Sequence, residues 1–169
     1  VMKWIMEGNK GLVYLRILRA PATALYEDDF TFTFGKAYPV KHRKEVQASI
    51  VSSGRGVHEA LAAADKLEAK GVHINVIDMP SIDEEAILEM HRSGKPVEQN
   101  NGYLWTNFRK VLFAQESRIN TQKLIPINTT THPQGLHYIH SGTYDELAAQ
   151  YGLDAEHLSD RIAETLKTL

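Results

Sequence analysis

The chain has 169 residues, 43% of them hydrophobic and 24% charged, and this composition fits a globular domain with one well-buried core and excludes intrinsic disorder. The formal net charge of −2 gives no basis for binding nucleic acid or an anionic membrane, and no apolar run reaches the roughly 20 residues that cross a bilayer, so we expect neither partner. The absence of cysteine excludes disulfides, thiolate catalysis and cysteine-based zinc sites.

The first 34 residues differ from the rest of the chain. Residues 3–7 look like the last turns of a helix that stops at Gly8, and residues 12–18 (LVYLRIL) predict a strand. A strand so close to the start has no partner within its own unit. It is therefore either an edge strand of the main sheet or the end of a preceding domain. Because the chain begins with Val1, we expect a processed product or a segment of a longer chain.

From residue 34 onward, strand and helix patterns alternate. Apolar runs predict strands at 34–40, 46–51, 72–77 and 123–128, and helical periodicity predicts helices at 57–70, 83–91, 103–113, 144–150 and from Asp154 onward. Strand, turn, helix and strand at 48–77 form a parallel, right-handed crossover. We therefore predict an α/β fold in three layers, with about five strands, mostly parallel with one antiparallel edge, and helices on both faces.

Local signals mark several of these boundaries. Ser81 with Glu84 predicts a capping box for the second helix, and Thr143 with Glu146 caps a later one. Pro126 lacks an amide donor, so the strand that contains it is predicted to lie at an edge or to carry a bulge.

A family signature runs from Ser52 to Ile87. It consists of Gly54-x-x-Val57-His58, an Ala/Leu-rich helix, and Met-Pro-Ser after the next strand. This wording resembles the C-terminal domain of transketolases. The end of the chain strengthens the resemblance, because GTYDEL at 142–147 precedes a Tyr-Gly-Leu turn and a final amphipathic helix. The matches cover nearly all of the chain from residue 12.

One departure from the family lies at residues 95–101 (KPVEQNN), where transketolases have a longer apolar strand before a Glu. The strand is predicted to be shortened by a few residues. Whether that shortening changes the central sheet is left open, and so are the positions of Glu98 and Gln99.

The resemblance implies a division of the chain. Residues 1–34 would be an arm, formed by the tail of a preceding pyrimidine-binding domain and a linker, and residues 35–169 the transketolase C-terminal-like domain. The implied function is that of a C-terminal domain or subunit of a thiamine-diphosphate enzyme that moves a two-carbon ketol unit between sugar phosphates. The implied role is structural, in a cytoplasmic homodimer that contacts the thiamine-diphosphate-binding domains of the parent enzyme or of a companion subunit.

The same resemblance implies that cofactor and catalytic residues lie elsewhere. Transketolases hold thiamine diphosphate and magnesium through a Gly-Asp-Gly…Asn stretch and activate the cofactor with a Glu of another domain, and this chain contains neither. We expect no catalytic residue, no cofactor and no metal in this chain alone, with thiamine diphosphate and Mg in the parent. Alternatives are a stand-alone regulatory or small-ligand module, and the equivalent domain of a deoxyxylulose-phosphate synthase or a 2-oxo-acid dehydrogenase beta subunit.

Arg19 is the one candidate for a substrate contact. It matches the second Arg of a strand that helps to bind the sugar phosphate in transketolases, and a planar guanidinium suits phosphate. Arg16 has no fixed role in the family. The alternative is an edge-strand arginine that is solvated or paired with Glu27, Asp28 or Asp29.

Other patterns favour structural roles. The turn Gly54-Arg55-Gly56 opens a helix but lacks the Walker lysine, so we interpret it as a tight strand-to-helix turn. His137 and His140 point to opposite faces of a strand, and His132 completes no ligand set with them. His58 is interpreted as a packing residue.

Two more sets of residues are candidates for a site. Glu98 and its neighbour Gln99 could supply a general base, yet Glu98 has no visible partner, so capping or an interdomain hydrogen bond is favoured. Tyr103, Trp105 and Phe108 recur at helical spacing, which favours core and subunit contacts over ligand stacking.

Overall fold

A computed structural model describes residues 2–8, 11–13, 22–99, 102–116, 118–129, 139 and 141–168. The strands are β1 (Tyr38–Lys41), β2 (Ala48–Ser52), β3 (Ile74–Asp78), β4 (Val97–Gln99) and β5 (Leu124–Pro126). The helices are α1 (Met2–Met6), α2 (Gly56–Glu68), α3 (Glu84–Arg92), α4 (Gly102–Gln115), the short 3-10 turn η1 (Thr121–Lys123), α5 (Tyr144–Gln150) and α6 (Ala155–Thr168).

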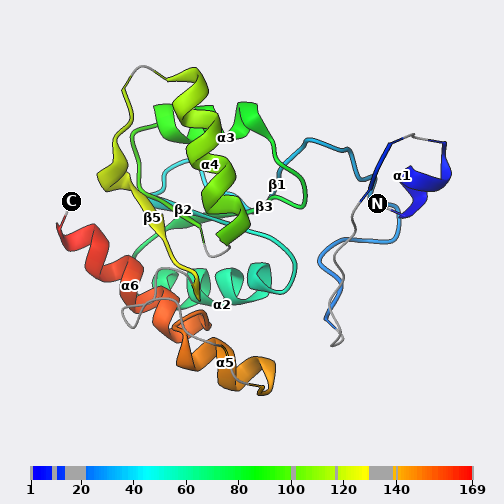
Figure 1. The fold of residues 1–169 in the computed structure, drawn as a ribbon. Coiled ribbons are helices and arrows are strands. Elements are labelled where there is room, and N and C mark those ends of the chain that lie inside the picture. The colour runs from blue at the N-terminus through cyan, green and yellow to red at the C-terminus, as the bar shows by residue number, and fades with distance from the viewer. Residues whose placement is uncertain are drawn as a thin grey trace.

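The sheet confirms the predicted fold class. Its strand order is β1-β3-β2-β4-β5, and neighbouring strands are parallel except for β1, which pairs antiparallel with β3 at one edge. Helices α2 and α6 cover one face of the sheet and α3 and α4 the other (Figure 1). Pro126 lies in β5, the opposite edge strand, as its missing amide donor predicts.

Apolar periodicity accounts for the two main cores. All five residues of β2 are buried because helices cover both faces of this central strand. On one face, Val57, Ala60, Ala64 and Leu67 of α2 pack with Ile162 of α6. The other face is filled by Leu104, Phe108, Val111 and Leu112 of α4, together with Ile87 of α3.

The short strand β4 keeps the sheet continuous. It has only three residues, yet Val97 pairs with both Ser49 of β2 and Leu124 of β5. The departure at residues 95–101 therefore shortens the strand without opening the sheet.

Two expectations about boundaries were wrong. The first strand begins at Tyr38 and not at residue 34, because Gly35 takes a left-handed φ of 77° in a turn. The second helix is capped by Asp83, whose side chain accepts a hydrogen bond from Ala86 N, and not by Ser81. The Ser81 hydroxyl instead accepts a hydrogen bond from Gly35 N, at 2.8 Å.

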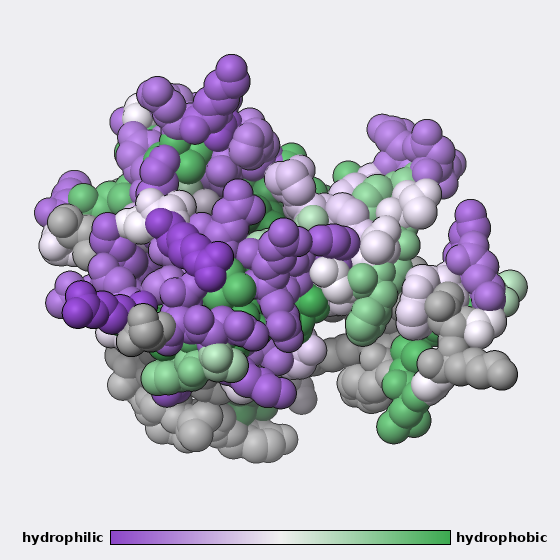
Figure 2. All heavy atoms as spheres, turned by 90° about the horizontal axis from the view of Figure 1, so that it is seen from above, coloured by the Kyte–Doolittle hydropathy of each residue, from purple (hydrophilic) through white to green (hydrophobic). Residues whose placement is uncertain are grey.

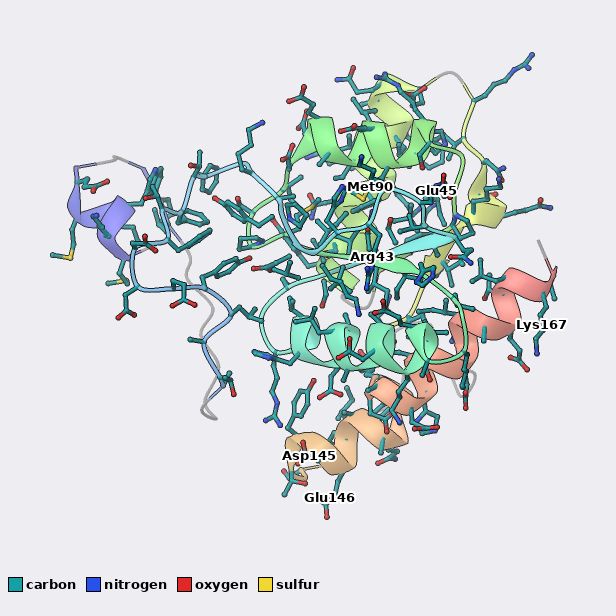
Figure 3. The ribbon with its side chains drawn as sticks, turned by 180° about the vertical axis from the view of Figure 1, so that it is seen from behind. Arg43, Glu45, Met90, Asp145, Glu146 and Lys167 are labelled. Carbon is teal, nitrogen blue, oxygen red and sulfur yellow. The ribbon has the colours of Figure 1, made fainter. Side chains whose placement is uncertain are left out.

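The C-terminal helices lie alongside α2. A capping box of Thr143 and Glu146 starts α5 as predicted, and Asp154 accepts a hydrogen bond from His157 N at the start of α6. Three ion pairs then join the two chain segments, each between residues 90 positions apart: Arg55–Asp145 at 2.9 Å, Lys66–Glu156, and Lys70–Asp160 at 3.4 Å. Figure 3 shows Asp145 at the start of α5, below the first turn of α2.

None of the helices in the described part of the chain is long and apolar enough to cross a membrane.

Candidate functional site

Ligands of open α/β sheets bind outside the carboxyl ends of the parallel strands, where the chain switches direction across the sheet. Here β3 lies on one side of β2 and β4 on the other, so the switch is next to the end of β2. The side chains of Ser52 and Asp78 stand at this edge, at the ends of β2 and β3, and pair in register. Both are buried, at 0% and 5% exposure.

Asp78 carries the electrostatically unusual group at this edge. Its Oδ2 accepts a hydrogen bond from the Tyr26 hydroxyl at 2.7 Å, whereas its Oδ1 and the Ser52 hydroxyl have no protein partner among the described residues. Burial raises the pKa of Asp78, against the Tyr26 hydrogen bond and the charge of His58, which lower it. Burial and the nearby carboxylate likewise raise the pKa of Tyr26. The geometry gives a buried carboxyl that holds a tyrosine in place.

In the turn from β2 to α2, the side chain of Arg55 contacts residues of α5. Gly54 has a φ of 59°, which glycine adopts without strain, and Arg55 is the N-cap residue without a side-chain cap. The Arg55 guanidinium lies 3.8 Å from the centre of the Tyr144 ring and also pairs with Asp145. The turn therefore joins α2 to α5, consistent with a structural interpretation.

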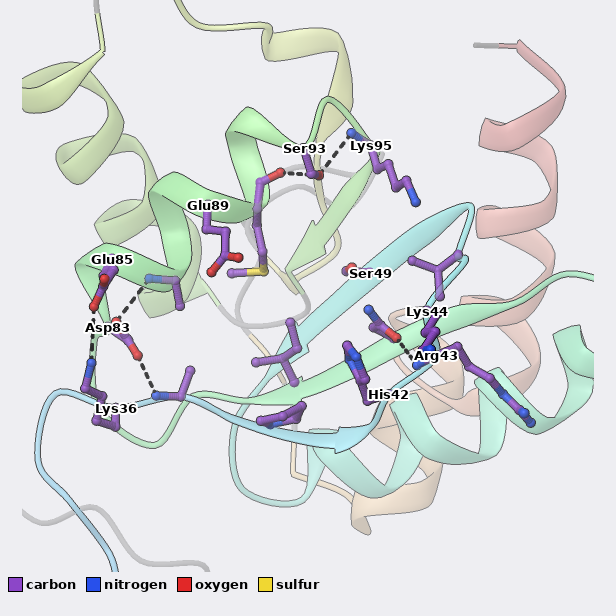
Figure 4. A pocket seen from close by; sticks show the side chains of 17 residues that line it. Lys36, His42, Arg43, Lys44, Ser49, Asp83, Glu85, Glu89, Ser93 and Lys95 are labelled. Carbon is purple, nitrogen blue, oxygen red and sulfur yellow. Dashed lines mark hydrogen bonds and ion pairs between the residues drawn. The ribbon is translucent and has the colours of Figure 1, made fainter.

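A groove of about 610 Å³ runs between β1 and α3. Figure 4 shows Lys36, Asp83 and Glu85 at one end and His42, Arg43, Lys44 and Lys95 at the other. The floor includes Ile77, a β3 residue that α3 covers incompletely. Arg43 pairs with Glu68, but no ion pair is found for the Lys44 or Lys95 side chain within the described ranges. This end of the groove carries unneutralised positive charge.

The N-terminal arm exposes apolar surface. It extends from the body in the ribbon view and forms a separate lobe in the space-filling view (Figures 1 and 2). Among the described residues of the arm, six large hydrophobic side chains are exposed: Met2, Met6, Leu12, Val13, Phe30 and Phe34. A cavity of about 270 Å³ lies between α1 and residues 26–32, and Trp4 stacks on Phe34 with ring centres 5.3 Å apart.

Several sequence candidates lie outside the described residues. Arg16, Arg19, His132, His137 and His140 all do. Glu98 and Gln99 are in β4, but their side chains are not described. The three aromatic candidates of α4 differ in burial: Phe108 is buried, Trp105 is half-buried and Tyr103 is 64% exposed.

Three residues to which the sequence assigned no such role carry the contacts between residues 26–37 and the rest of the body: Tyr26, Ser81 and Asp83. Their partners are far apart in the sequence, by 46 to 52 positions, so no local pattern announces the contacts. The one available signal was the density of hydroxyl and carboxylate side chains just after β3.

The described residues contain no cluster of metal-ligating side chains. Within these ranges, no three His, Asp or Glu side chains come together as metal ligands do. The sequence also lacks the Gly-Asp-Gly…Asn stretch that the family resemblance associates with thiamine diphosphate and magnesium.

The comparisons with known proteins agree on one family. Residues 35–158 match the family model described as transketolase, C-terminal domain. The chain is 31% identical over 166 residues to a protein of Methanocaldococcus jannaschii named as a transketolase C-terminal section, covering 94% of this chain and 49% of that protein. It is 23% identical to mouse transketolase-like protein 2, covering 96% of this chain and 26% of that protein.

Solved structures give the same result. A structure titled split gene transketolase, inactive beta4 tetramer superposes with a TM-score of 0.68 and 25% identity, over 88% of this chain and 48% of that one. A Campylobacter jejuni transketolase shares the fold, with a TM-score of 0.57, 20% identity, and coverage of 83% of this chain and 20% of that one. The chain thus spans about half or less of the length of these similar proteins.

Proposed function

The chain belongs to the transketolase C-terminal domain family, and from that membership we propose that it serves as the C-terminal domain or subunit of a transketolase-type enzyme. The observation that carries the proposal is the family match over residues 35–158, next to a relative of which the chain covers only 49%. The complete enzyme would transfer a two-carbon ketol unit between sugar phosphates in the cytoplasm.

The proposed role of this chain is structural. In the complete enzyme, thiamine diphosphate would supply the electron sink that ketol transfer needs. The cofactor and its magnesium would be held by companion domains, because the Gly-Asp-Gly…Asn stretch that holds them in transketolases is absent from this sequence. The buried carboxyl of Asp78 accepts a hydrogen bond from Tyr26, which is a structural contact.

The division into an arm of residues 1–34 and a domain of residues 35–169 remains part of the proposal. The exposed apolar side chains of the arm support it, since each large apolar side chain left in water forgoes about 1.5–3 kcal/mol of burial. We propose that the arm contacts a companion thiamine-diphosphate-binding domain, and a second copy of this chain in a homodimer.

A reconstitution assay tests the function. The purified chain, with thiamine diphosphate, magnesium and pentose phosphates, should show no ketol transfer. Adding a chain that carries the two cofactor-binding domains of the same enzyme should produce turnover. Turnover by this chain alone contradicts the structural role. No association with such a companion favours the stand-alone alternative.

The stand-alone alternative has one observation in its favour, the groove between β1 and α3 with its positively charged end. An independent binding module should bind a small organic anion there without any companion chain. A calorimetric titration of the chain with phenyl phosphate measures this binding. Suppose that phenyl phosphate binds, that Lys44→Gln and Lys95→Gln abolish the binding, and that no companion chain produces turnover. The stand-alone module would then replace the first proposal.

Arg19 is proposed to contact the sugar phosphate in the complete enzyme. Losing a hydrogen bond to a charged group costs about 1.5–3 kcal/mol, which corresponds to about ten- to a hundredfold in KM. Arg19→Ala should therefore raise KM for phosphorylated substrates and barely change it for unphosphorylated ones, with Arg16→Ala as the control. Equal losses on both substrate classes would assign Arg19 to the fold.

Self-association of the arm is tested by sedimentation. Met6 and Leu12 are 81% and 105% exposed, so Met6→Glu and Leu12→Glu together should shift the dimer toward monomer at micromolar concentration. Phe113 is 66% exposed on the body, and Phe113→Glu is the matched control. The homodimer is contradicted if the unsubstituted chain is already monomeric and proteases remove its arm rapidly.

A further inference from the structure

Buried polarity is concentrated in one short segment of the molecule. Of the seven polar or charged residues buried in the described part of the chain, three lie between residues 78 and 85, which we call the seat: Asp78, Ser81 and Asp83. Burying a polar group is unfavourable unless it is hydrogen-bonded. Three such groups in eight residues therefore call for a common partner.

That partner is the linker, defined as residues 25–37. Besides the bond from Tyr26 to Asp78, Gly35 N donates to the Ser81 hydroxyl at 2.8 Å and Ala37 N donates to Asp83 Oδ2 at 2.9 Å. Leu25 also packs against the core on the α2 face of the sheet. The contacts follow the same order along both segments, so the linker is held to the seat at three points.

Asp83 joins two elements with a single carboxylate. Its Oδ1 accepts the hydrogen bond from Ala86 N that caps α3, at 3.1 Å, while Oδ2 accepts the bond from the linker (Figure 4). An asparagine would put an NH2 group in place of one of these two acceptor oxygens and so lose one of the two bonds as they are arranged here. The linker is thus attached to the rigid start of a helix.

The attachment extends to α1 through aromatic rings. Gly35, with its left-handed φ, places Phe34 at the turn, and the Phe34 ring stacks on Trp4 of α1. Tyr26 and Phe30 stack on each other with centres 3.9 Å apart, beside the ring of Tyr38 in β1. A linker held at Gly35 and Ala37 therefore also holds α1.

We propose that Ser81 and Asp83 are positioning residues that fix the direction in which the linker and α1 leave the body. The inference concerns the orientation of the arm and does not depend on the proposed enzymatic role.

Distance measurement between two spin labels tests the orientation. Because the chain has no cysteine, Met6→Cys and Lys110→Cys give two unique labelling sites, one on α1 and one on the outer side of α4. We expect one narrow distance distribution, which becomes broad when Ser81→Ala and Asp83→Ser are added. A broad distribution before those substitutions, or an unchanged width after them, overturns the proposal.

Hydrogen exchange separates the linker contact from the helix cap. Serine is a good N-cap residue but has one short hydroxyl, so Asp83→Ser should keep α3 capped and release Ala37. The Ala37 amide should then exchange about tenfold faster, while the amides of α3 keep their protection. Asp83→Ala should accelerate both.

Two further variants complete the test. Ser81→Ala should accelerate exchange of the Gly35 amide alone. Because this variant loses only one hydroxyl, it can be measured even if the double variant fails to fold. Glu85→Gln removes only the exposed ion pair with Lys36, at 3.3 Å, and should change neither exchange rates nor label distances. A positioning role is contradicted if the Gly35 amide exchanges at the same rate in Ser81→Ala and the Ala37 amide at the same rate in Asp83→Ser.

Discussion

The body of the molecule and its N-terminal arm bury their apolar side chains to very different extents. In the body, Phe108 and Leu112 of α4 are fully enclosed against α3 and the sheet. In the arm, Phe34 is 65% exposed and Met6 81% exposed. The body repeats apolar residues with the period of its helices and strands and so closes a core of its own. The described residues of the arm include large apolar side chains that stay exposed, which is the pattern of a segment completed by another surface.

The sharpest test of this contrast removes one phenylalanine from each region. Phe108→Ala should lower the free energy of unfolding by about 3–5 kcal/mol, because it leaves a cavity in a packed core. Phe34→Ala should change it by less than about 0.5 kcal/mol, as substitutions at exposed positions do. Urea unfolding followed by circular dichroism measures both. Similar losses at the two positions would show that the arm belongs to the core of this chain.

A smaller effect concerns Asp78, where the arm meets the body. Burial raises its pKa above the ordinary value of 3.8. The folded protein thus keeps the proton to higher pH than the unfolded chain does. The contribution of this group to stability is therefore complete below pH 3.8 and is lost as pH rises through the higher, folded value.

Asp78→Asn removes that titration but keeps an oxygen to accept from Tyr26. We expect the variant to lose less stability than the unsubstituted chain between pH 4 and pH 7 and to be at least as stable at pH 7. Thermal melts across that pH range measure this. Asp28→Asn, on the exposed linker, is the control. A steeper pH dependence in the Asp78 variant would mean that the ionised carboxylate stabilises the fold.

The smallest effect lies in the body, at the ion pairs between β1 and α2. Lys41 pairs with Asp65 at 2.6 Å and with Glu68 at 2.8 Å, near the surface. Lys41→Met should lower the free energy of unfolding by about 0.2–1 kcal/mol, since exposed pairs contribute little. The difference from the parent should shrink in 1 M salt, which screens the pairs. A salt-independent loss would point to packing of the lysine stem.

Most of the fold could be predicted from local patterns. The stripe of Val57, Ala64 and Leu67 indicates the buried face of α2, and Thr143 with Glu146 marks the start of α5, because each signal lies within a few residues of the structure it specifies. Pro126 indicates an edge because its missing amide donor is a property of the residue itself.

The contacts between arm and body could not be predicted in this way. Ser81 and Asp83 lie two residues apart before the same helix, and both are good caps by residue type. Asp83 takes that role, and Ser81 accepts from Gly35, 46 residues away. A partner at that distance leaves no periodic trace in the sequence. Arg19 rests on resemblance alone, because it lies outside the described residues.

The constant separation of 90 residues between α2 and its ion-pair partners also determines when this chain can finish folding. Leu67 and Val57 of α2 are buried in a core that Ile162 of α6 helps to close. During synthesis, α2 therefore waits for nearly a hundred further residues before its last apolar neighbour emerges. Contacts over such separations slow folding and leave apolar surface exposed meanwhile. Ribosome-bound chains that end before residue 155 should accordingly bind chaperones, and those that include α6 should release them.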